Sequence, residues 1–421
     1  MPLPFHCLPK EYTIMKTISV LSLFLLSFMT FAKTKTLFFE VKPEGSSLVI
    51  KPTLNSYYPS AGIQITSTGF GLPSNAGCIP HANGYCLFPT STLSPAIIQI
   101  NGNGSFTFKL CLNGQARINC QNYAITKFPA VQVTKAYVSN TLNVNVTTCE
   151  VNPTTGVLST CIGNPQPTGF SPFGLAFNAA ANKLYVANYG SDTITTCDVA
   201  PTTGVLSTCT GNPQPAGFDP IGLAFNSIAY KLYVARENIS NTITTCEVNP
   251  TTGALSACTS NPQSAGNTPT SLALNATAHK LYVANRLSNN VTTCEVSPTT
   301  GVLSVCTGNP QPAGNSPQGL AFNASAHKLY VANSLDNNIT TCEVNPTTGA
   351  LSACTGNPQP AGNTPRGLAF NSSTHKLYVG NFNNNTVTTC DVNPTTGVLS
   401  ACTLNPQPTG GSPGGLALFE K

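Results

Sequence analysis

Short apolar runs alternate with polar turns along residues 172–209 and outline four strands. Residues 174–177 (GLAF) follow a proline and are wholly apolar, as in a fully buried strand. Residues 183–187 (KLYVA) form a second strand, and residues 193–199 (TITTCDV) alternate β-branched and polar positions as a third. A Pro-Thr-Thr-Gly turn at residues 201–204 leads into a fourth strand at residues 205–209. The pattern predicts an antiparallel four-stranded unit.

This unit occurs six times, at intervals of 48 or 49 residues. Such a period indicates one supersecondary unit copied in a ring or a row, because no single copy buries its apolar face alone. Four short strands per repeat form the blade of a β-propeller. The clearest marker is a Lys-x-Tyr-Val box, whose tyrosines are Tyr137, Tyr185, Tyr233, Tyr282, Tyr330 and Tyr378.

The first-strand motif is displaced relative to the other three strands. Strand two first occurs at residues 136–139, whereas the first-strand motif begins at Gly174 and ends with residues 415–418, close to the C-terminus. The last strand is therefore expected to complete the first blade, which hides two open sheet edges. We predict an all-β, six-bladed propeller closed by this strand exchange. In a seven-bladed alternative, residues 129–133 would supply an extra strand.

The cysteines support this interpretation of the hairpins. Of 17 cysteines, Cys7 lies upstream of the predicted signal cleavage site, and the other 16 form an even set. Twelve occur as Cys-x11-Cys pairs centred on the Pro-Thr-Thr-Gly turns, so strands three and four would bring the partners into disulfide range. Disulfides are favoured over a metal site, because CxxC motifs and Cys/His clusters are absent. The predicted pairs are Cys149–Cys161, Cys197–Cys209, Cys246–Cys258, Cys294–Cys306, Cys342–Cys354 and Cys390–Cys402.

A lysine starts strand two and an acidic residue ends strand three in every repeat. Their separation of 15 or 16 residues is what a cross-strand pair requires, so we expect six ion pairs of small stabilising effect. Six of the 14 acidic residues are thereby removed from the candidates for catalysis. The expected pairs are Lys135/Glu150, Lys183/Asp198, Lys231/Glu247, Lys280/Glu295, Lys328/Glu343 and Lys376/Asp391.

The N-terminus resembles a secretory signal. Residues 15–32 combine a basic start at Met15-Lys16, an apolar stretch and a Thr30-Phe31-Ala32 cleavage site, while residues 1–14 are interpreted as an upstream extension. The apolar stretch is short for a membrane span, and no other segment is a candidate for one. With the disulfides, this predicts a secreted, periplasmic or cell-surface protein. We also expect a monomer.

Residues 33–127 lack the repeat, and the propeller is assigned to residues 128–421. Alternating stretches separated by Gly, Asn and Pro turns predict a small β-sandwich in residues 33–127. Four cysteines there allow three connectivities, of which Cys78–Cys86 and Cys111–Cys120 are the simplest. Such a module is expected to position or anchor its neighbour.

The composition limits the classes of binding partner that the protein is expected to have. Only 8% of residues are charged, and the formal net charge of +5 is spread along the chain without a basic cluster. Nucleic acid is therefore not an expected partner.

Several motifs carry a resemblance to a known family. Residues 171–177 (SPFGLAF), 183–188 (KLYVAN) and 192–195 (DTIT) resemble the YVTN-type β-propeller repeat of exported bacterial and archaeal proteins, which is related to lactonase-like propellers. The resemblance covers residues 129–421 and implies a propeller. The chain departs from the usual seven blades and adds paired cysteines. Because the family includes binding proteins and enzymes, the resemblance implies no single activity.

Differences between the otherwise uniform repeats indicate candidate binding residues. They concentrate at the residue after the proline that opens strand one and in the loop between strands two and three. In a propeller these positions share the face around the central channel, so a constant framework with one variable face predicts a binding surface. Drift of unconstrained loops is the alternative. The candidates are Phe173, Tyr189, Ile221, Arg236, Thr270, Arg286, Gln318, Arg366 and Phe382.

Catalytic signals are sparse. Asp219 and Glu237 share one repeat and could form a general acid–base pair at the channel mouth, although no histidine or activated nucleophile accompanies them. His279, His327 and His375 occupy equivalent turns of separate blades, which would hold them too far apart to share a metal ion. No Ser/His/Asp motif or phosphate-binding loop is present. We therefore predict no metal and no cofactor.

Together these observations predict an exported binding scaffold that contacts a protein or a glycan through loops at the channel mouth. The first alternative, implied by the resemblance, is a lactonase-like hydrolase acting on sugar or acyl lactones. The second is an architectural protein of the cell envelope.

Overall fold

The computed structural model describes the backbone of eight strands between residues 39 and 125, and then residues 134–209, 211–237 and 241–420. The chain divides into two compact units, residues 1–130 and 131–421. The predicted signal (15–32), the upstream extension (1–14), the possible extra strand (129–133) and Cys78 lie outside the described residues. Within the part that is described, no helix is long and apolar enough to cross a membrane.

The described strands of the first unit form two antiparallel sheets. One has the strand order β1-β2-β6 and the other β4-β5-β3-β7-β8. Register places Cys111 of β7 opposite Cys120 of β8. The β-sandwich and its disulfides stay predictions. The strands are β1 (Phe39–Glu44), β2 (Ser47–Pro52), β3 (Tyr58–Ile65), β4 (Ile79–Pro80), β5 (Cys86–Thr90), β6 (Ala96–Gln99), β7 (Phe106–Leu112) and β8 (Cys120–Ile125).

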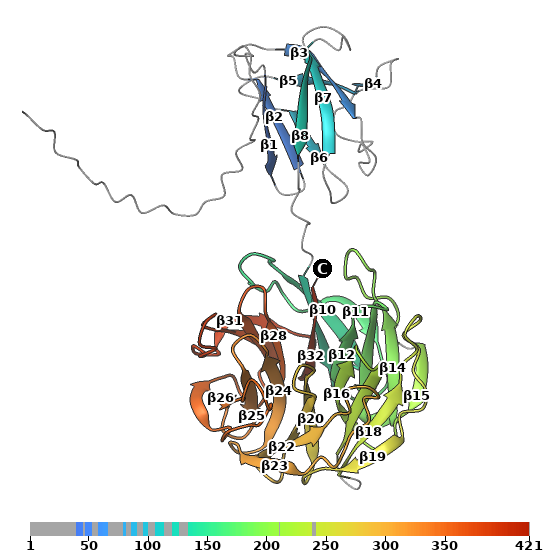
Figure 1. Ribbon diagram of the computed structural model, residues 1–421, viewed down its shortest axis with the longest axis vertical. Coiled ribbons are helices and arrows are strands. Elements are labelled where there is room, and N and C mark those ends of the chain that lie inside the picture. Colours follow the sequence, from blue (N-terminus) through green and yellow to red (C-terminus); the bar gives the residue numbers. More distant parts are fainter. Residues whose placement is uncertain are drawn as a thin grey trace, which may run out of the picture. The chain divides into compact units, whose positions relative to one another are not determined.

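The second unit is a propeller of six four-stranded antiparallel sheets, which we number as blades I to VI (Figure 1). Blade I consists of β32 (Pro413–Glu420), β9 (Thr134–Asn140), β10 (Asn145–Val151) and β11 (Gly163–Pro167). Blade II consists of β12 (Pro172–Asn178), β13 (Lys183–Asn188), β14 (Thr193–Asp198) and β15 (Gly211–Pro215). Blade III consists of β16 (Pro220–Asn226), β17 (Lys231–Arg236), β18 (Thr242–Glu247) and β19 (Ser260–Ser264).

Blades IV to VI follow the same pattern. They are β20 (Pro269–Asn275), β21 (Lys280–Asn285), β22 (Asn290–Glu295), β23 (Gly308–Pro312); β24 (Pro317–Asn323), β25 (Lys328–Asn333), β26 (Asn338–Glu343), β27 (Gly356–Pro360); and β28 (Pro365–Asn371), β29 (Lys376–Asn381), β30 (Thr386–Asp391), β31 (Leu404–Pro408).

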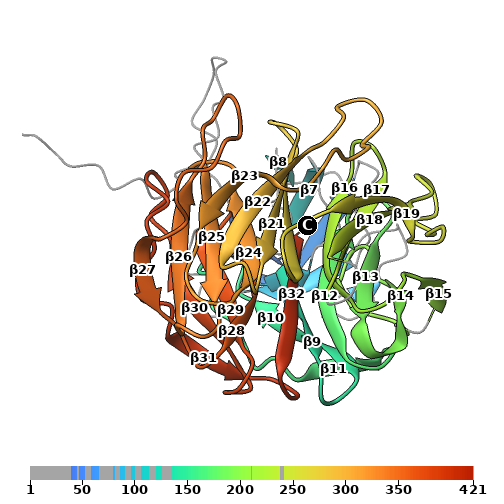
Figure 2. The same ribbon diagram turned by 90° about the horizontal axis from the view of Figure 1, so that it is seen from below.

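Strand exchange closes the ring, as the displaced motif predicted. The C-terminal strand β32 pairs with β9, with Ala417 opposite Tyr137, so one blade joins the two ends of the propeller sequence (Figure 2). The prediction of six blades is confirmed, and the seven-bladed alternative is not what the described chain forms.

The predicted position of the fourth strand is wrong. Residues 205–209 make only one bridge, between Val199 and Leu206, and the outermost strand of blade II is β15, with the sequence GNPQP. Two prolines in five residues argue against a strand in a sheet interior. They are tolerated here because the outermost strand bonds a neighbour on one side only.

The disulfide and ion-pair predictions are confirmed in all six blades. Each Cys-x11-Cys pair is bonded. Each expected lysine–carboxylate pair is formed, with the acidic side chain more than half exposed, so its contribution to stability is small.

The box tyrosines link neighbouring blades. All six are fully buried, and each hydroxyl donates to the glycine carbonyl of the next blade's Pro-Thr-Thr-Gly turn at 2.7–2.9 Å. The bond from Tyr378 to Gly156 completes the circle between blades VI and I. These turn glycines have φ between 64° and 69°, the left-handed region that favours glycine.

Candidate functional site

Two rings of variable residues surround the channel mouth. The channel ring is the second residue of each first strand, and it consists of Gly414, Phe173, Ile221, Thr270, Gln318 and Arg366. The loop ring is the residue after each second strand, and it consists of Thr141, Tyr189, Glu237, Arg286, Ser334 and Phe382. In every blade the loop-ring N–H donates to the carbonyl of the residue before the proline that opens strand one, as in Tyr189 to Ser171 at 3.0 Å. This bond holds both rings on one face.

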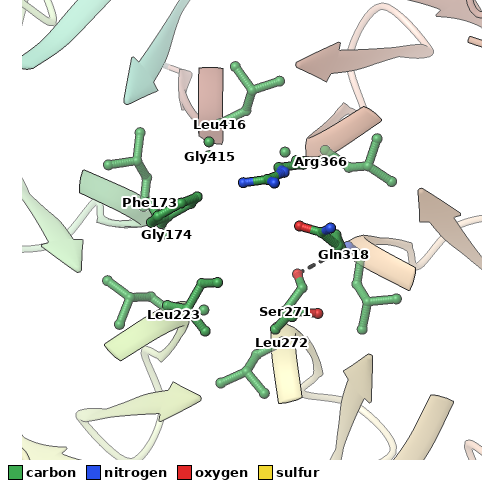
Figure 3. Close-up of a pocket in the computed structure, with 17 residues that line it drawn as sticks. Phe173, Gly174, Leu223, Ser271, Leu272, Gln318, Arg366, Gly415 and Leu416 are labelled. Carbon is green, nitrogen blue, oxygen red and sulfur yellow. Dashed lines mark hydrogen bonds between the residues drawn. The ribbon is translucent and has the colours of Figure 1, made fainter. Parts of the chain in front are cut away.

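The channel ring lines a cavity of about 80 Å³ at the mouth (Figure 3). Phe173, Gln318 and Arg366 lie around its opening and come from three different blades. Ligand pockets for drug-sized molecules are about 300–1,000 Å³, so this cavity accommodates a small chemical group and not a whole sugar.

A collar of small residues follows this ring along the first strands. Gly174, Gly222, Ser271, Gly319, Gly367 and Gly415 occupy the third position of the first strands. A Cβ atom at Gly222 would lie 2.6 Å from the carbonyl oxygen of Thr270, which is closer than real contacts allow. The serine of blade IV accepts a hydrogen bond from the Leu320 N–H at 3.1 Å. The first-strand backbones of neighbouring blades therefore approach closely at this collar.

One side of the mouth is aromatic and carries a cation. The Phe173 and Phe382 rings are nearly parallel, with centroids 6.3 Å apart, and Tyr189 packs edge-on against Phe173 at 5.7 Å. The Arg366 guanidinium carbon lies 3.6 Å from the Phe382 centroid and 5.6 Å from that of Phe173. Gly414 leaves the space that lets Phe173 reach across blade I, since a Cβ there would come within 2.8 Å of the Phe173 ring.

The other side of the mouth is polar. The Gln318 amide donates to the Ser334 hydroxyl at 2.9 Å, and the Thr270 hydroxyl donates to the Pro317 carbonyl at 3.0 Å. Arg286 pairs with the buried carboxylate of Glu237 at 2.6 Å. Apart from the Glu237–Arg286 pair, the rings carry one further charge, that of Arg366.

Burial lowers the pKa of Arg366 to about 10, with Glu237 acting in the opposite sense and Arg286 in the same sense. A pKa of about 10 still leaves the guanidinium charged at neutral pH.

Around the rings lies an apolar rim, which the sequence did not reveal. One large apolar side chain, more than 60% exposed, stands in each of blades I to V on this face. Each rim residue lies either two residues before the proline that opens strand one or in the loop between strands two and three. In blades II, IV, V and VI a backbone hydrogen bond joins these two positions, as from the Leu287 N–H to the Asn267 carbonyl. In blade VI both positions are asparagine, Asn363 and Asn383. The rim consists of Leu142, Phe170, Phe218, Leu287 and Leu335.

The predicted binding residues therefore fall into three groups. Phe173, Ile221, Thr270, Gln318 and Arg366 line the cavity. Tyr189, Arg286 and Phe382 belong to the loop ring: Tyr189 and Phe382 pack against Phe173, whereas Arg286 pairs with Glu237. Arg236 lies further out, where its guanidinium covers Gly217 and donates to the Phe218 carbonyl at 3.4 Å.

The two predicted catalytic carboxylates are close in the backbone, since the Glu237 N–H donates to the Asp219 carbonyl at 3.0 Å. The Glu237 side chain, however, is engaged by Arg286. The three histidines have φ of 51–54° at turns between first and second strands. Across the described residues, no three His, Cys, Asp or Glu side chains gather in a way that could hold a metal ion.

Comparisons with known proteins agree with this fold. A family model described as "Lactonase, 7-bladed beta-propeller" matches residues 128–268 and 174–360, which together span more than half of the chain. No curated protein matches the sequence.

Among solved structures, a candidate 6-phosphogluconolactonase from Bacteroides uniformis is 16% identical with a TM-score of 0.50, covering 86% of this chain and 99% of its own. The periplasmic gluconolactonase PpgL of Pseudomonas aeruginosa is also 16% identical, with a TM-score of 0.46 and coverage of 86% and 99%. At such identity the first likeness indicates fold alone. By its sequence match, the chain belongs to the lactonase, 7-bladed β-propeller family, and it builds that propeller from six blades.

Proposed function

We propose that this protein is an exported binding scaffold that docks another polypeptide on its channel-mouth face. The observation that carries the proposal is the concentration of differences in two rings on one face, within a framework that repeats six times. Six disulfides support an oxidising compartment, secreted, periplasmic or at the cell surface. The finer assignment to YVTN-type repeats and a monomeric state belong to the same proposal.

The rim favours a protein over a glycan as partner. Five exposed Leu and Phe side chains gathered on one face favour a protein partner, because grouped exposed apolar side chains mark interaction surfaces. The channel cavity is also too small for a sugar ring with its hydration shell.

The test compares a rim variant with a matched control. The rim variant replaces Leu142, Phe170, Phe218, Leu287 and Leu335 by Ser. The control replaces Val157, Val205, Val302 and Val398 by Ser, because these turn valines are also exposed, at 46–50%, but lie away from the mouth. Partners are captured from the envelope and medium of the producing cell, purified, and titrated against each protein.

A partner that binds wild type and control with the same affinity, and the rim variant at least ~10-fold more weakly, supports the proposal; ~10-fold corresponds to about 1.4 kcal/mol. Equal affinity for all three proteins would contradict it. The architectural alternative predicts that no saturable partner is found at all.

A lactonase-like hydrolase is the second candidate, and the family match is what favours it. Asp219 and Glu237 would be its acid–base pair, although the ion pair with Arg286 occupies the Glu237 carboxylate. Gluconolactone, 6-phosphogluconolactone and acyl lactones are the substrates to assay, with and without divalent metal. Turnover that Asp219→Asn with Glu237→Gln abolishes would establish this candidate, and turnover unaffected by both changes would eliminate this version of it.

A further inference from the structure

We propose that Arg366 is the anchor of the docking face and binds the carboxylate of an acidic side chain presented by the polypeptide partner. This inference rests on the proposed function and adds the chemistry of the central contact.

The guanidinium of Arg366 lacks an acceptor in the described part of the chain. It stacks on Phe382 and approaches Phe173, but no carboxylate, carbonyl or hydroxyl accepts from it there, and its Nε is buried without a partner. The other two arginines at this face differ, because Arg286 pairs with Glu237 and Arg236 donates to a carbonyl. A largely desolvated cation with unused donors favours binding of an anion, which restores those hydrogen bonds.

The cavity beside Arg366 matches a carboxylate in size and charge. Its volume of about 80 Å³ accommodates a group of a few heavy atoms. The nearest acid that influences Arg366 is Glu237, which Arg286 already neutralises, so one positive charge is left for the ligand. Across the opening, the Ser271 hydroxyl offers a polar contact (Figure 3).

Stacking fixes the direction from which the anion arrives. Phe382 covers one face of the guanidinium at 3.6 Å, so the N–H groups around its edge are what a ligand meets. A planar guanidinium edge binds a carboxylate in the bidentate manner. Gly414 keeps the neighbouring position free of a side chain.

The surroundings of the cavity identify the source of the carboxylate as a polypeptide. The apolar rim runs through blades I to V and is interrupted by asparagines at blade VI, the blade that carries Arg366. An acidic residue flanked by apolar residues would place its carboxylate on Arg366 while its neighbours cover the rim. A free small carboxylate would use the cavity and leave the rim exposed.

The test uses two pairs of probes that differ only in charge. Propionate is compared with propionamide, and N-acetyl-Leu-Glu-Leu-amide with its Gln counterpart, by saturation-transfer NMR at constant ionic strength. We expect propionate and the Glu peptide to bind saturably, the peptide at least ~10-fold more tightly, with no saturable binding of the two amides.

Variants assign the effect to Arg366. Arg366→Gln is expected to weaken the Glu peptide at least ~10-fold, and Arg366→Lys to restore part of the loss, because Lys keeps the charge without the planar fork. Lys183→Gln removes the same charge at an ion pair that lies at the end of β13 away from the mouth, and should change nothing. Gly414→Val narrows the cavity and should weaken propionate without removing a charge. Circular dichroism and disulfide mapping establish that each variant is folded.

Equal binding of Glu and Gln peptides, or full affinity of a folded Arg366→Gln protein, would overturn the anchor. Propionate binding as tightly as the Glu peptide would overturn the polypeptide as its source. These results are separable from failure of the proposed function: loss of partner binding in the rim variant, with no charge preference at Arg366, keeps the docking face and removes only the anchor.

Discussion

The guanidinium of Arg366 stacks on Phe382 with its carbon 3.6 Å from the ring centre, and both residues belong to blade VI. The contact offsets part of the cost of burying a cation, typically by about 0.5–2 kcal/mol. The Nε–H of Arg366 is buried without a hydrogen-bond partner among the described residues, and a buried donor without a partner calls for an explanation such as a ligand.

The first prediction concerns the free-energy cost of burying the Arg366 cation. Arg366→Met keeps an unbranched side chain over Phe382 and removes the unpaired charge, so it should stabilise the protein by about 1 kcal/mol. For a domain of this size that raises the thermal midpoint by about 2–4 °C, measured by calorimetry under oxidising conditions. Phe382→Leu is the companion variant and should lower the midpoint, because Arg366 loses its stacking partner. A lower midpoint for Arg366→Met would mean that the cation is satisfied in the native protein.

The second prediction concerns the collar of small residues, most of which line the cavity. Gly319→Ala should destabilise by about 1–3 kcal/mol or more, because its Cβ would overlap the carbonyl oxygen of Arg366 on the next first strand. The matched change is Ser271→Gly at the equivalent position of blade IV, which loses one hydrogen bond to Leu320 and should cost about 1 kcal/mol. Urea unfolding of both variants measures the difference. Similar costs would show that the blades can move apart.

Much of the framework could be predicted from the sequence because it is repeated and local. The period, the box tyrosines and the displaced first strand were sufficient to predict six blades and their closure. Cys197 with Cys209 and Lys183 with Asp198 are partners within one hairpin, so spacing along the chain determined them.

Relationships between blades were not predictable in this way. Arg366 lies near Phe173 across blade I, and Arg286 pairs with Glu237 of the preceding blade. Neither contact can be predicted from the residue spacing within one repeat. The fourth strand was misplaced because its prolines resemble a loop. The sequence does contain signals for the rim and the collar. Phe170 and Phe218 replace the asparagine found at that position in three other repeats, and Ser271 replaces a collar glycine.

The third prediction concerns the disulfides. Removing one pair, Cys246→Ala with Cys258→Ala, should cost about 2–4 kcal/mol by the chain-entropy estimate. The loss of stability should be limited to blade III and the adjoining strand of blade II, because the Cys258 N–H bonds the Pro215 carbonyl at the end of β15. Hydrogen exchange should therefore rise in β15 and β19 and stay unchanged in blade V. The equivalent change at Cys342 and Cys354 should move the effect to β23 and β27. Exchange that rises everywhere would contradict independent blades.

The last prediction follows from the tyrosine ring. Burial raises the pKa of Tyr185, Tyr282, Tyr330 and Tyr378 to about 12, and raises that of Tyr137 and Tyr233 as well. An unfolded tyrosine ionises near pH 10, so above that pH the unfolded chain releases protons that the folded protein retains. Stability from these residues is complete below about pH 10 and is lost as the pH rises towards about 12.

Alkaline titration checks this prediction with two signals. The tyrosinate absorbance of the six box residues should appear together with loss of the β circular dichroism, as one cooperative transition above pH 10. Protein unfolded in guanidinium is the control and should titrate near pH 10 without cooperativity. Tyr185→Phe removes one titrating group but also the bond to Gly253, so it should lower stability by about 1 kcal/mol at neutral pH and make the alkaline transition less steep.

Because each hydroxyl bridges two blades, ionisation would place a negative charge against a carbonyl oxygen at all six junctions, and the ring should open as a whole. Ionisation of all six in protein that keeps its circular dichroism would show that these hydroxyls are not sealed between the blades.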